Sequence, residues 1–298
     1  MNEVFITGSS GFLGSHLTNS MKENSRIIGL GNNYQKIKSK NIRYNKIDLR
    51  AKNIRINSKI SSIIHLAALS DVKFCNENPS LCIDVNVLGT KKILEICRKK
   101  DANFIFASTS HVYGKPNKIP ISEKEEIKVN SIYAASKIMG ENLCESYAKT
   151  YGLNIAILRF FSIYGPGAPK HNVINSIINQ ALSDSQVRLG NLKPKRDFVY
   201  VDDVINAIKI TNNLQKGFQV FNVGGEKSFS IKTICDKIEK NLMKKIKIKI
   251  DKIKIRKNDI LDIRSDCSKI NKMYNWKSET SLEEGLLKTC QFYQKNRK

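Results

Sequence analysis

The sequence contains little that would support a metal site, a disulfide framework or a membrane span. Its seven cysteines form no C-x-x-C pair, which favours free thiols in a reducing compartment. Its four histidines lack the spacing of metal ligands, so we expect no bound metal. No apolar run approaches the roughly 18 residues that a membrane helix needs. The chain also begins without the basic and apolar regions of a signal peptide, so we expect a cytoplasmic protein.

Acidic residues are few relative to basic ones. The chain has 51 Lys and Arg against 27 Asp and Glu, which gives a net charge of +24. This excess fits either nucleic-acid binding or a lysine-rich surface with an anionic small-molecule substrate. No zinc finger or RNA-binding aromatic motif accompanies the lysines, and the densest run, at residues 244–257, alternates Lys with Ile like an edge strand. Nucleic-acid binding is therefore the less favoured alternative.

Strand-like apolar runs alternate with helical spacing over the first half of the chain. We expect strands at residues 4–7, 26–30, 42–47, 60–66, 103–107 and 154–158. We expect helices at residues 12–22, 86–99 and 132–150. This alternation predicts an α/β fold built on a parallel, doubly wound sheet.

Three glycines stand between the first expected strand and the first expected helix. Gly8, Gly11 and Gly14 suit a dinucleotide-binding turn, because they permit a sharp turn, a close approach of a pyrophosphate and tight packing of helix on strand. The pyrophosphate then meets free N–H groups at the start of the helix. The pattern alone is a weak signal, and an ordinary strand-to-helix turn is the alternative.

The alternating pattern changes after Arg159, where residues 165–169 have the composition of a loop. We expect a dinucleotide-binding domain at residues 1–165 and a smaller mixed α/β substrate lobe at residues 166–298. Residues around 195–225 are expected to return to the first domain.

Tyr133 and Lys137 form a candidate acid/base pair. They lie four residues apart, on one face of an expected helix. A free tyrosine has a pKa of about 10, so we expect the Lys137 charge, together with the positive ring of a bound nicotinamide, to lower the pKa of Tyr133. Thr109, one structural unit upstream, is expected to hydrogen-bond a substrate oxygen and orient it for proton transfer. A surface helix pair is the alternative for Tyr133 and Lys137 taken alone.

The chain resembles the extended short-chain dehydrogenase/reductase family, the NAD-dependent sugar-nucleotide epimerases and dehydratases with a Rossmann fold. The resemblance covers residues 4–286. It rests on seven segments, at residues 7–14, 65–68, 86–90, 108–114, 133–137, 158–166 and 196–204.

The resemblance implies which residues bind the cofactor. The pyrophosphate would lie against Ser10, Gly11, Phe12 and Leu13, and Gly8 and Gly14 would complete the same cofactor-binding turn. Asp48 and Leu49 would border the adenine, and Asn86 would brace the cofactor. The remaining cofactor contacts would come from Gly31, Asn32, Leu66, Ala67, Ala68, Ser70, Ser108, Tyr133, Lys137, Phe160 and Ile163.

One position departs from the NAD-preferring pattern. Gly31 stands where that pattern has an acidic residue to hold the ribose hydroxyls, and Lys36 and Lys38 follow it. We expect NAD, since a neighbouring asparagine can hydrogen-bond ribose, and NADP is the alternative.

The resemblance also implies a nucleoside diphosphate sugar as substrate. Arg196 and Arg256 would grip the diphosphate, because guanidinium groups match phosphate oxygens. The other substrate contacts would come from Thr109, Phe161, Ser162, Asn172 and Asp259. A homodimer is expected by analogy, with helices near residues 82–99 and 132–150 paired as a four-helix bundle.

The leading hypothesis is a nucleotide-sugar 4-epimerase of the UDP-glucose/UDP-galactose type, or one acting on the N-acetyl analogues, which oxidises C4 transiently with bound NAD. A 4,6-dehydratase is less favoured, because Ser110 and His111 replace the Asp-Glu pair of those enzymes. An NADPH-dependent 4-ketoreductase is the main alternative and is favoured by Gly31. A non-enzymatic dinucleotide- or RNA-binding relative is the alternative of another class.

Overall fold

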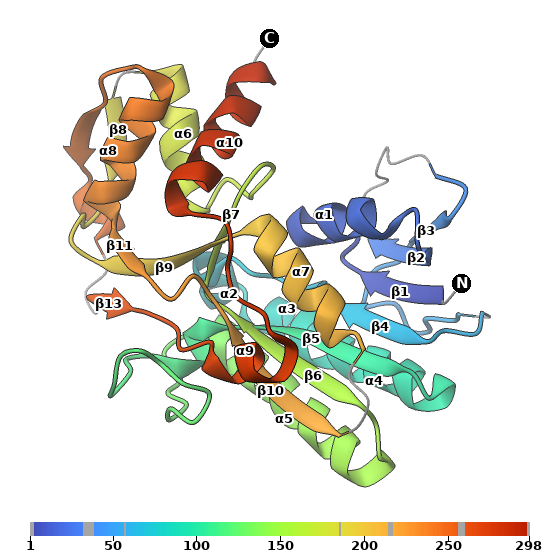
Figure 1. The fold of residues 1–298 in the computed structure, drawn as a ribbon. Coiled ribbons are helices and arrows are strands. Elements are labelled where there is room, and N and C mark those ends of the chain that lie inside the picture. Colours follow the sequence, from blue (N-terminus) through green and yellow to red (C-terminus); the bar gives the residue numbers. More distant parts are fainter. Residues whose placement is uncertain are drawn as a thin grey trace. The chain divides into compact units, whose positions relative to one another are not determined.

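The computed structural model describes residues 3–31, 39–56, 58–184, 186–213, 217–255 and 260–296. The chain divides into two compact units (Figure 1). The first consists of residues 1–114, 127–160 and 205–221, and the second of residues 115–126, 161–204 and 222–298. The chain therefore leaves the first unit after residue 114 and re-enters it twice.

Within the described residues, the first unit is built on a seven-stranded sheet with the order β10-β6-β5-β4-β1-β2-β3. The strands are β1 (Glu3–Thr7), β2 (Arg26–Gly31), β3 (Ile42–Lys46), β4 (Ser62–His65), β5 (Asn103–Thr109), β6 (Ile155–Phe160) and β10 (Phe218–Val223). Strands β1 to β6 pair in parallel. The strand order reverses between β1 and β4, and ligands of such sheets bind beyond the carboxyl ends of the strands at that point. The predicted fold class is confirmed.

A row of apolar side chains explains how the sheet is covered. Phe5, Ile63, Phe104 and Ile155 are paired across four neighbouring strands and are at most 1% exposed. They pack in one core with residues of α4 (Gly89–Lys100) and α5 (Ile132–Tyr151), while α1 (Phe12–Met21) lies on the other side of the strands (Figure 1). The other helical elements that fall wholly or partly in this unit are α2 (Val72–Glu77), α3 (Pro79–Ile83), the π-helical turn η1 (Asp84–Leu88), the 3₁₀ turn η2 (Ser110–Tyr113) and α7 (Val201–Thr211).

The second unit contains smaller sheets and four longer helices among its described residues. Its strands are β7 (Ser162–Tyr164), β8 (Gln186–Leu189), β9 (Lys195–Tyr200), β11 (Ser228–Ser230), β12 (Lys247–Ile250) and β13 (Asp262–Ile263). Its helices are α6 (Val173–Ser183), α8 (Ile231–Leu242), the 3₁₀ turn η3 (Lys252–Lys254), α9 (Ser268–Tyr274) and α10 (Leu282–Lys295). Strand β9 pairs with β7, β11 and β13, and the Lys/Ile strand β12 pairs with β8.

Candidate active site

The glycine turn after β1 is shaped for close backbone contacts. Gly8 has a φ of +70°, and a Cβ there would lie 2.8 Å from the backbone nitrogen of Ala67. A Cβ at Gly14 would collide with the carbonyl oxygen of Gly8. Gly11 precedes α1 without a side-chain cap, so no capping side chain occupies the first N–H groups of the helix. These N–H groups suit an anionic ligand such as a pyrophosphate.

A pocket of about 280 Å³ lies beside this turn. It is lined by eight residues that the sequence predicted as cofactor contacts: Gly8, Ser10, Gly11, Gly31, Asp48, Leu49, Ala67 and Ala68. It also includes six that sequence reasoning missed: Leu30, Ile47, Arg50, Leu69, Leu81 and Val85. Of the other expected contacts, Phe12, Leu13 and Gly14 open α1, Leu66 and Ser70 lie in the segment after β4, and Asn32 lies outside the described residues.

Gly31 has a steric reason to be glycine. A Cβ at this position would collide with the side-chain oxygen of Ser10 and lie 3.1 Å from its Cβ. An acidic side chain at residue 31 therefore requires Ser10 to move.

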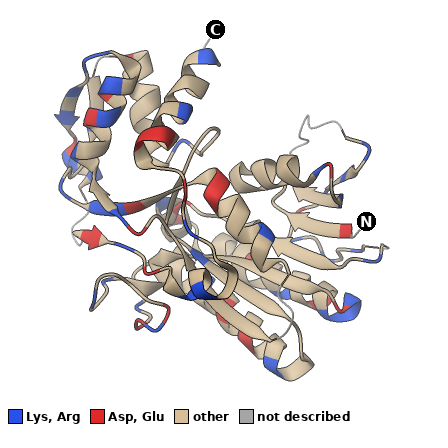
Figure 2. Cartoon of the chain, viewed as in Figure 1, with Lys and Arg blue, Asp and Glu red and all other residues tan. Residues whose placement is uncertain are grey.

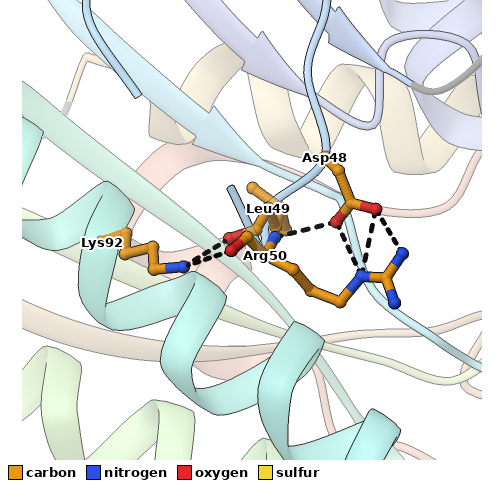
Figure 3. Close-up of polar contacts among 4 residues, drawn as sticks. All are labelled: Asp48, Leu49, Arg50 and Lys92. Atoms are coloured by element: carbon orange, nitrogen blue, oxygen red, sulfur yellow. Dashed lines mark hydrogen bonds and ion pairs between the residues drawn. The ribbon is translucent and has the colours of Figure 1, made fainter. Parts of the chain in front are cut away.

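Asp48 and Arg50 form an ion pair at the edge of the pocket (Figure 3). The Arg50 side chain donates to both carboxylate oxygens, with Nη2 2.6 Å from Oδ2, and the Arg50 backbone N–H donates to Oδ1. Hydrogen bonds from Arg50 hold the pKa of Asp48 below its usual range. The carboxylate expected to border the adenine therefore has a cationic partner within the protein.

Asn86 is buried in the π-helical turn and holds the segment after β4. Its Oδ1 accepts from the Leu69 N–H at 2.8 Å, and its Nδ2 donates to the Leu69 carbonyl at 3.0 Å. Nδ2 also lies 3.0 Å from Ser136 Oγ on α5. Asn86 thus braces a residue that lines the pocket, and it links that residue to the helix of Tyr133.

A buried histidine forms a second brace. His65 Nδ1 lies 2.6 Å from Thr7 Oγ1, and its Nε2 lies 3.0 Å from Thr90 Oγ1. Thr7 Oγ1 in turn accepts from the Ala67 N–H. Burial, with a smaller contribution from the Lys137 charge, lowers the pKa of His65 to about 3. A neutral imidazole therefore joins the ends of β1 and β4 beside the glycine turn.

The predicted acid/base residues come together in the first unit. Thr109 ends β5, and Tyr133 and Lys137 lie one turn apart on α5, which is capped by Ser131. The three are 7%, 8% and 4% exposed, respectively. Lys137 Nζ donates to the Ala107 carbonyl at 2.8 Å, so the ammonium is anchored to the strand that carries Thr109.

Burial dominates the electrostatics of Tyr133 in the protein alone. Burial raises the pKa of Tyr133 above its ordinary value, and a hydrogen bond with Thr109 opposes that rise. Burial also lowers the pKa of Lys137 to about 8. The lowering expected from Lys137 together with the nicotinamide ring stays a prediction, because in the protein without a cofactor the cost of ionising a buried phenol dominates.

A buried ion pair that the sequence reasoning missed stands behind the acid/base pair. Glu141, one turn beyond Lys137, accepts from Arg159 of β6 at 2.6 Å and from Ser108 Oγ at 2.5 Å. Arg159 also donates to the Tyr113 hydroxyl at 3.0 Å. Both charged side chains are 6% exposed. A charged residue in the otherwise apolar β6 was the available sequence signal.

Four of the expected substrate contacts lie in the described part of the second unit. Phe161 is buried and donates its N–H to Val223, and Ser162 opens β7. Asn172 caps α6 and donates to the Ile163 carbonyl at 2.8 Å, so its side chain has a structural role. Arg196 Nη1 donates to the Ile260 carbonyl at 2.7 Å.

Two expected cofactor contacts lie close to these residues in the sequence: Ile163 is on β7, and Phe160 ends β6. Arg256 and Asp259 lie outside the described residues.

Basic residues occur on elements of both units in Figure 2, rather than on one element. In the described ranges, no group of three or more His, Cys, Asp or Glu side chains could hold a metal ion. No helix in these ranges has the length and apolar character to cross a membrane.

The chain belongs to the NAD dependent epimerase/dehydratase family, whose model matches residues 4–224. The family predicted from the sequence is confirmed.

Several relatives and solved structures align with this chain over nearly its whole length. A putative UDP-glucose 4-epimerase of Methanocaldococcus jannaschii is 33% identical and aligns over 98% of this chain and 99% of its own length. A UDP-glucuronate 4-epimerase of Thermodesulfobacterium geofontis is 31% identical, over 99% and 97%. The crystal structure of a Thermotoga maritima UDP-glucose 4-epimerase with UDP-glucose has a TM-score of 0.89 and 26% identity, over 99% of this chain and 100% of that one. MoeE5 in complex with UDP-glucose and NAD has a TM-score of 0.91 and 25% identity, over the full length of both chains.

Proposed function

We propose that this protein is an NAD-dependent nucleotide-sugar 4-epimerase. The observation that carries the proposal is the placement of Thr109, Tyr133 and Lys137 in the same unit as the glycine-turn pocket. The relatives support the reaction class, since several are named as epimerases of UDP-glucose or UDP-glucuronate.

The residues of the pocket fit a dinucleotide. The backbone cradle at Gly8 and Gly11 and the uncapped start of α1 suit a pyrophosphate, and Leu49 and Ala67 offer apolar surface. Bound NAD would accept hydride from the sugar carbon and return it.

We infer a preference for NAD over NADP. The charged residues among those described around the pocket are Asp48 and Arg50, and they neutralise each other. An additional 2′-phosphate therefore meets no unpaired cation among the described lining residues, although Gly31 removes the acid that would repel it. Lys36 and Lys38 lie outside the described residues. Dissociation constants for the two cofactors test this preference, and tighter binding of NADP would refute it.

In the proposed mechanism the chain supplies a proton relay at O4 of the sugar. Tyr133 accepts the proton of the O4 hydroxyl and later returns it, while Thr109 orients the same oxygen through its hydroxyl. Because burial raises the pKa of Tyr133, the phenolate forms only when positive charge approaches it. Lys137, fixed to Ala107, holds one such charge and can also hold a ribose hydroxyl.

We further propose that the substrate is a UDP-hexose or its uronate. Arg196, Phe161 and Ser162 remain candidate contacts on the second unit by the family resemblance. The test is incubation with UDP-glucose, UDP-N-acetylglucosamine or UDP-glucuronate without added cofactor, followed by NMR of the sugar. We expect inversion at C4 of one of them. Absence of inversion with all three refutes the proposal, whereas steady consumption of NADPH with a 4-keto sugar identifies the reductase.

We also propose a homodimer formed through α4 and α5. Residues 139, 143, 147 and 151 form an apolar row at i, i+4 spacing on α5, and Met139 and Tyr151 at its ends are 46% and 50% exposed. We expect light scattering to give twice the monomer mass for the unmodified protein and a lower mass for the Met139→Lys variant. A monomeric mass for the unmodified protein at micromolar concentration excludes this arrangement.

A further inference from the structure

Lys92 holds the backbone of the loop that borders the pocket. Its Nζ donates to the carbonyl oxygens of Leu49 and Arg50, each at 3.1 Å (Figure 3), and to that of the next residue, Ala51, at 3.0 Å. An ammonium group has three N–H donors, so these bonds use all of them. A single side chain of α4 therefore gathers three adjacent carbonyl groups.

The loop of residues 47–52 lies outside the paired strands. Residues 49–52 form a turn and a bend shortly after β3, so their carbonyl groups lack the partners that a strand or helix provides. Leu49 is 5% exposed and lies against Gly89, where a Cβ would come within 3.1 Å of the leucine Cβ. The start of α4 thus fixes the loop twice, once by packing at Gly89 and once by hydrogen bonding at Lys92.

The same loop supplies the charged edge of the pocket. Asp48, Leu49 and Arg50 all line it, and the Lys92 charge is among the causes that lower the pKa of Asp48. Lys92 itself is absent from that lining, and it meets the loop backbone on the side away from the Asp48 carboxylate (Figure 3). We propose that Lys92 is a positioning residue for the adenosine half of the cofactor, acting through the backbone of residues 49–51. The inference rests on the proposed binding of NAD.

The mechanism is preorganisation. A loop held in its binding conformation loses less conformational freedom when the ligand arrives. We call the three Lys92 hydrogen bonds the Lys92 clamp. Its loss should reduce the free energy of ligand binding by about as much as one charged hydrogen bond contributes, which corresponds to a roughly tenfold weaker complex.

The test uses calorimetric titration of the full-length protein with ADP-ribose and, separately, with UDP. We expect Lys92→Met to weaken ADP-ribose binding about tenfold and to leave UDP binding unchanged. Lys92→Arg, which keeps a cationic donor, should recover most of the loss. Lys91→Met is the matched control, because Lys91 is the exposed neighbour on the same helix and should have no effect.

Hydrogen exchange provides an independent measurement of the clamp. Peptides covering residues 48–52 should exchange faster in Lys92→Met while the β1 and β5 peptides keep their protection. Unchanged ADP-ribose affinity in Lys92→Met, or equal losses for ADP-ribose and UDP, overturns the inference alone. Failure of the unmodified protein to bind ADP-ribose removes the proposed function, and the inference falls with it.

Discussion

The buried pair of Glu141 and Arg159 allows a quantitative prediction. The two side chains are 6% exposed and are joined at 2.6 Å, and the carboxylate also accepts from Ser108. Replacing Arg159 with Met leaves a buried carboxylate without its cation. Removing one partner of such a pair costs about 3–5 kcal/mol of the free energy of unfolding. In a chain of this size that lowers the melting temperature by roughly 10 °C.

A double-mutant cycle separates the pair from its surroundings. We expect Arg159→Met and Glu141→Met to be strongly destabilising on their own. The double variant should lose only about 1–2 kcal/mol, because no charge of the pair stays buried and the hydroxyls of Ser108 and Tyr113 each lose one partner. Urea unfolding measures all three variants, and Lys149→Met serves as the control, because its partner Glu145 forms an exposed pair on the same helix. That control should cost less than about 1 kcal/mol. Additive losses in the double variant refute the account of the pair.

Two further predictions concern the elements around the pocket. The folded pKa of His65 lies at about 3, below its unfolded value of about 6.5, so the unfolded state binds more protons between these values. The stability that the neutral His65 contributes is therefore fully present above a pH of about 6.5, and the free energy of unfolding falls by several kcal/mol towards a pH of about 3. Urea unfolding across this pH range measures the fall. A flat profile would show that His65 is not held neutral. Gly14→Ala should abolish NAD binding and destabilise the fold by about 1–3 kcal/mol, because its Cβ collides with Gly8. Gly152→Ala is the control, since no atom lies within 4 Å of a Cβ there and only the φ of +68° opposes it, at a cost of about 1 kcal/mol.

Much of the fold could be predicted because its strands and helices have distinct periodicities. The helices expected at residues 12–22 and 132–150 are α1 (Phe12–Met21) and α5 (Ile132–Tyr151). Boundaries were less certain where apolar residues extend beyond the paired segment. The fourth strand was expected at residues 60–66 but spans only Ser62–His65.

Tertiary features of the site could not be inferred from spacing. The expected Asn86–Lys99 helix begins with a π-helical turn that directs Asn86 towards Leu69. The Lys92 clamp joins residues 41–43 positions apart, and no local pattern indicates it. The raised pKa of Tyr133 in the protein alone could not be inferred either, because burial of the phenol is decided by the packing of α5 on the sheet.

The central claim is that the Tyr133 phenol transfers the O4 proton. The most direct test is the rate of C4 inversion in Tyr133→Phe, measured with folded protein whose affinity for NAD is that of the unmodified chain. We predict a rate at least about 100-fold lower, because the ring is kept and only the proton acceptor is lost. Inversion at the unmodified rate would show that another group performs this step.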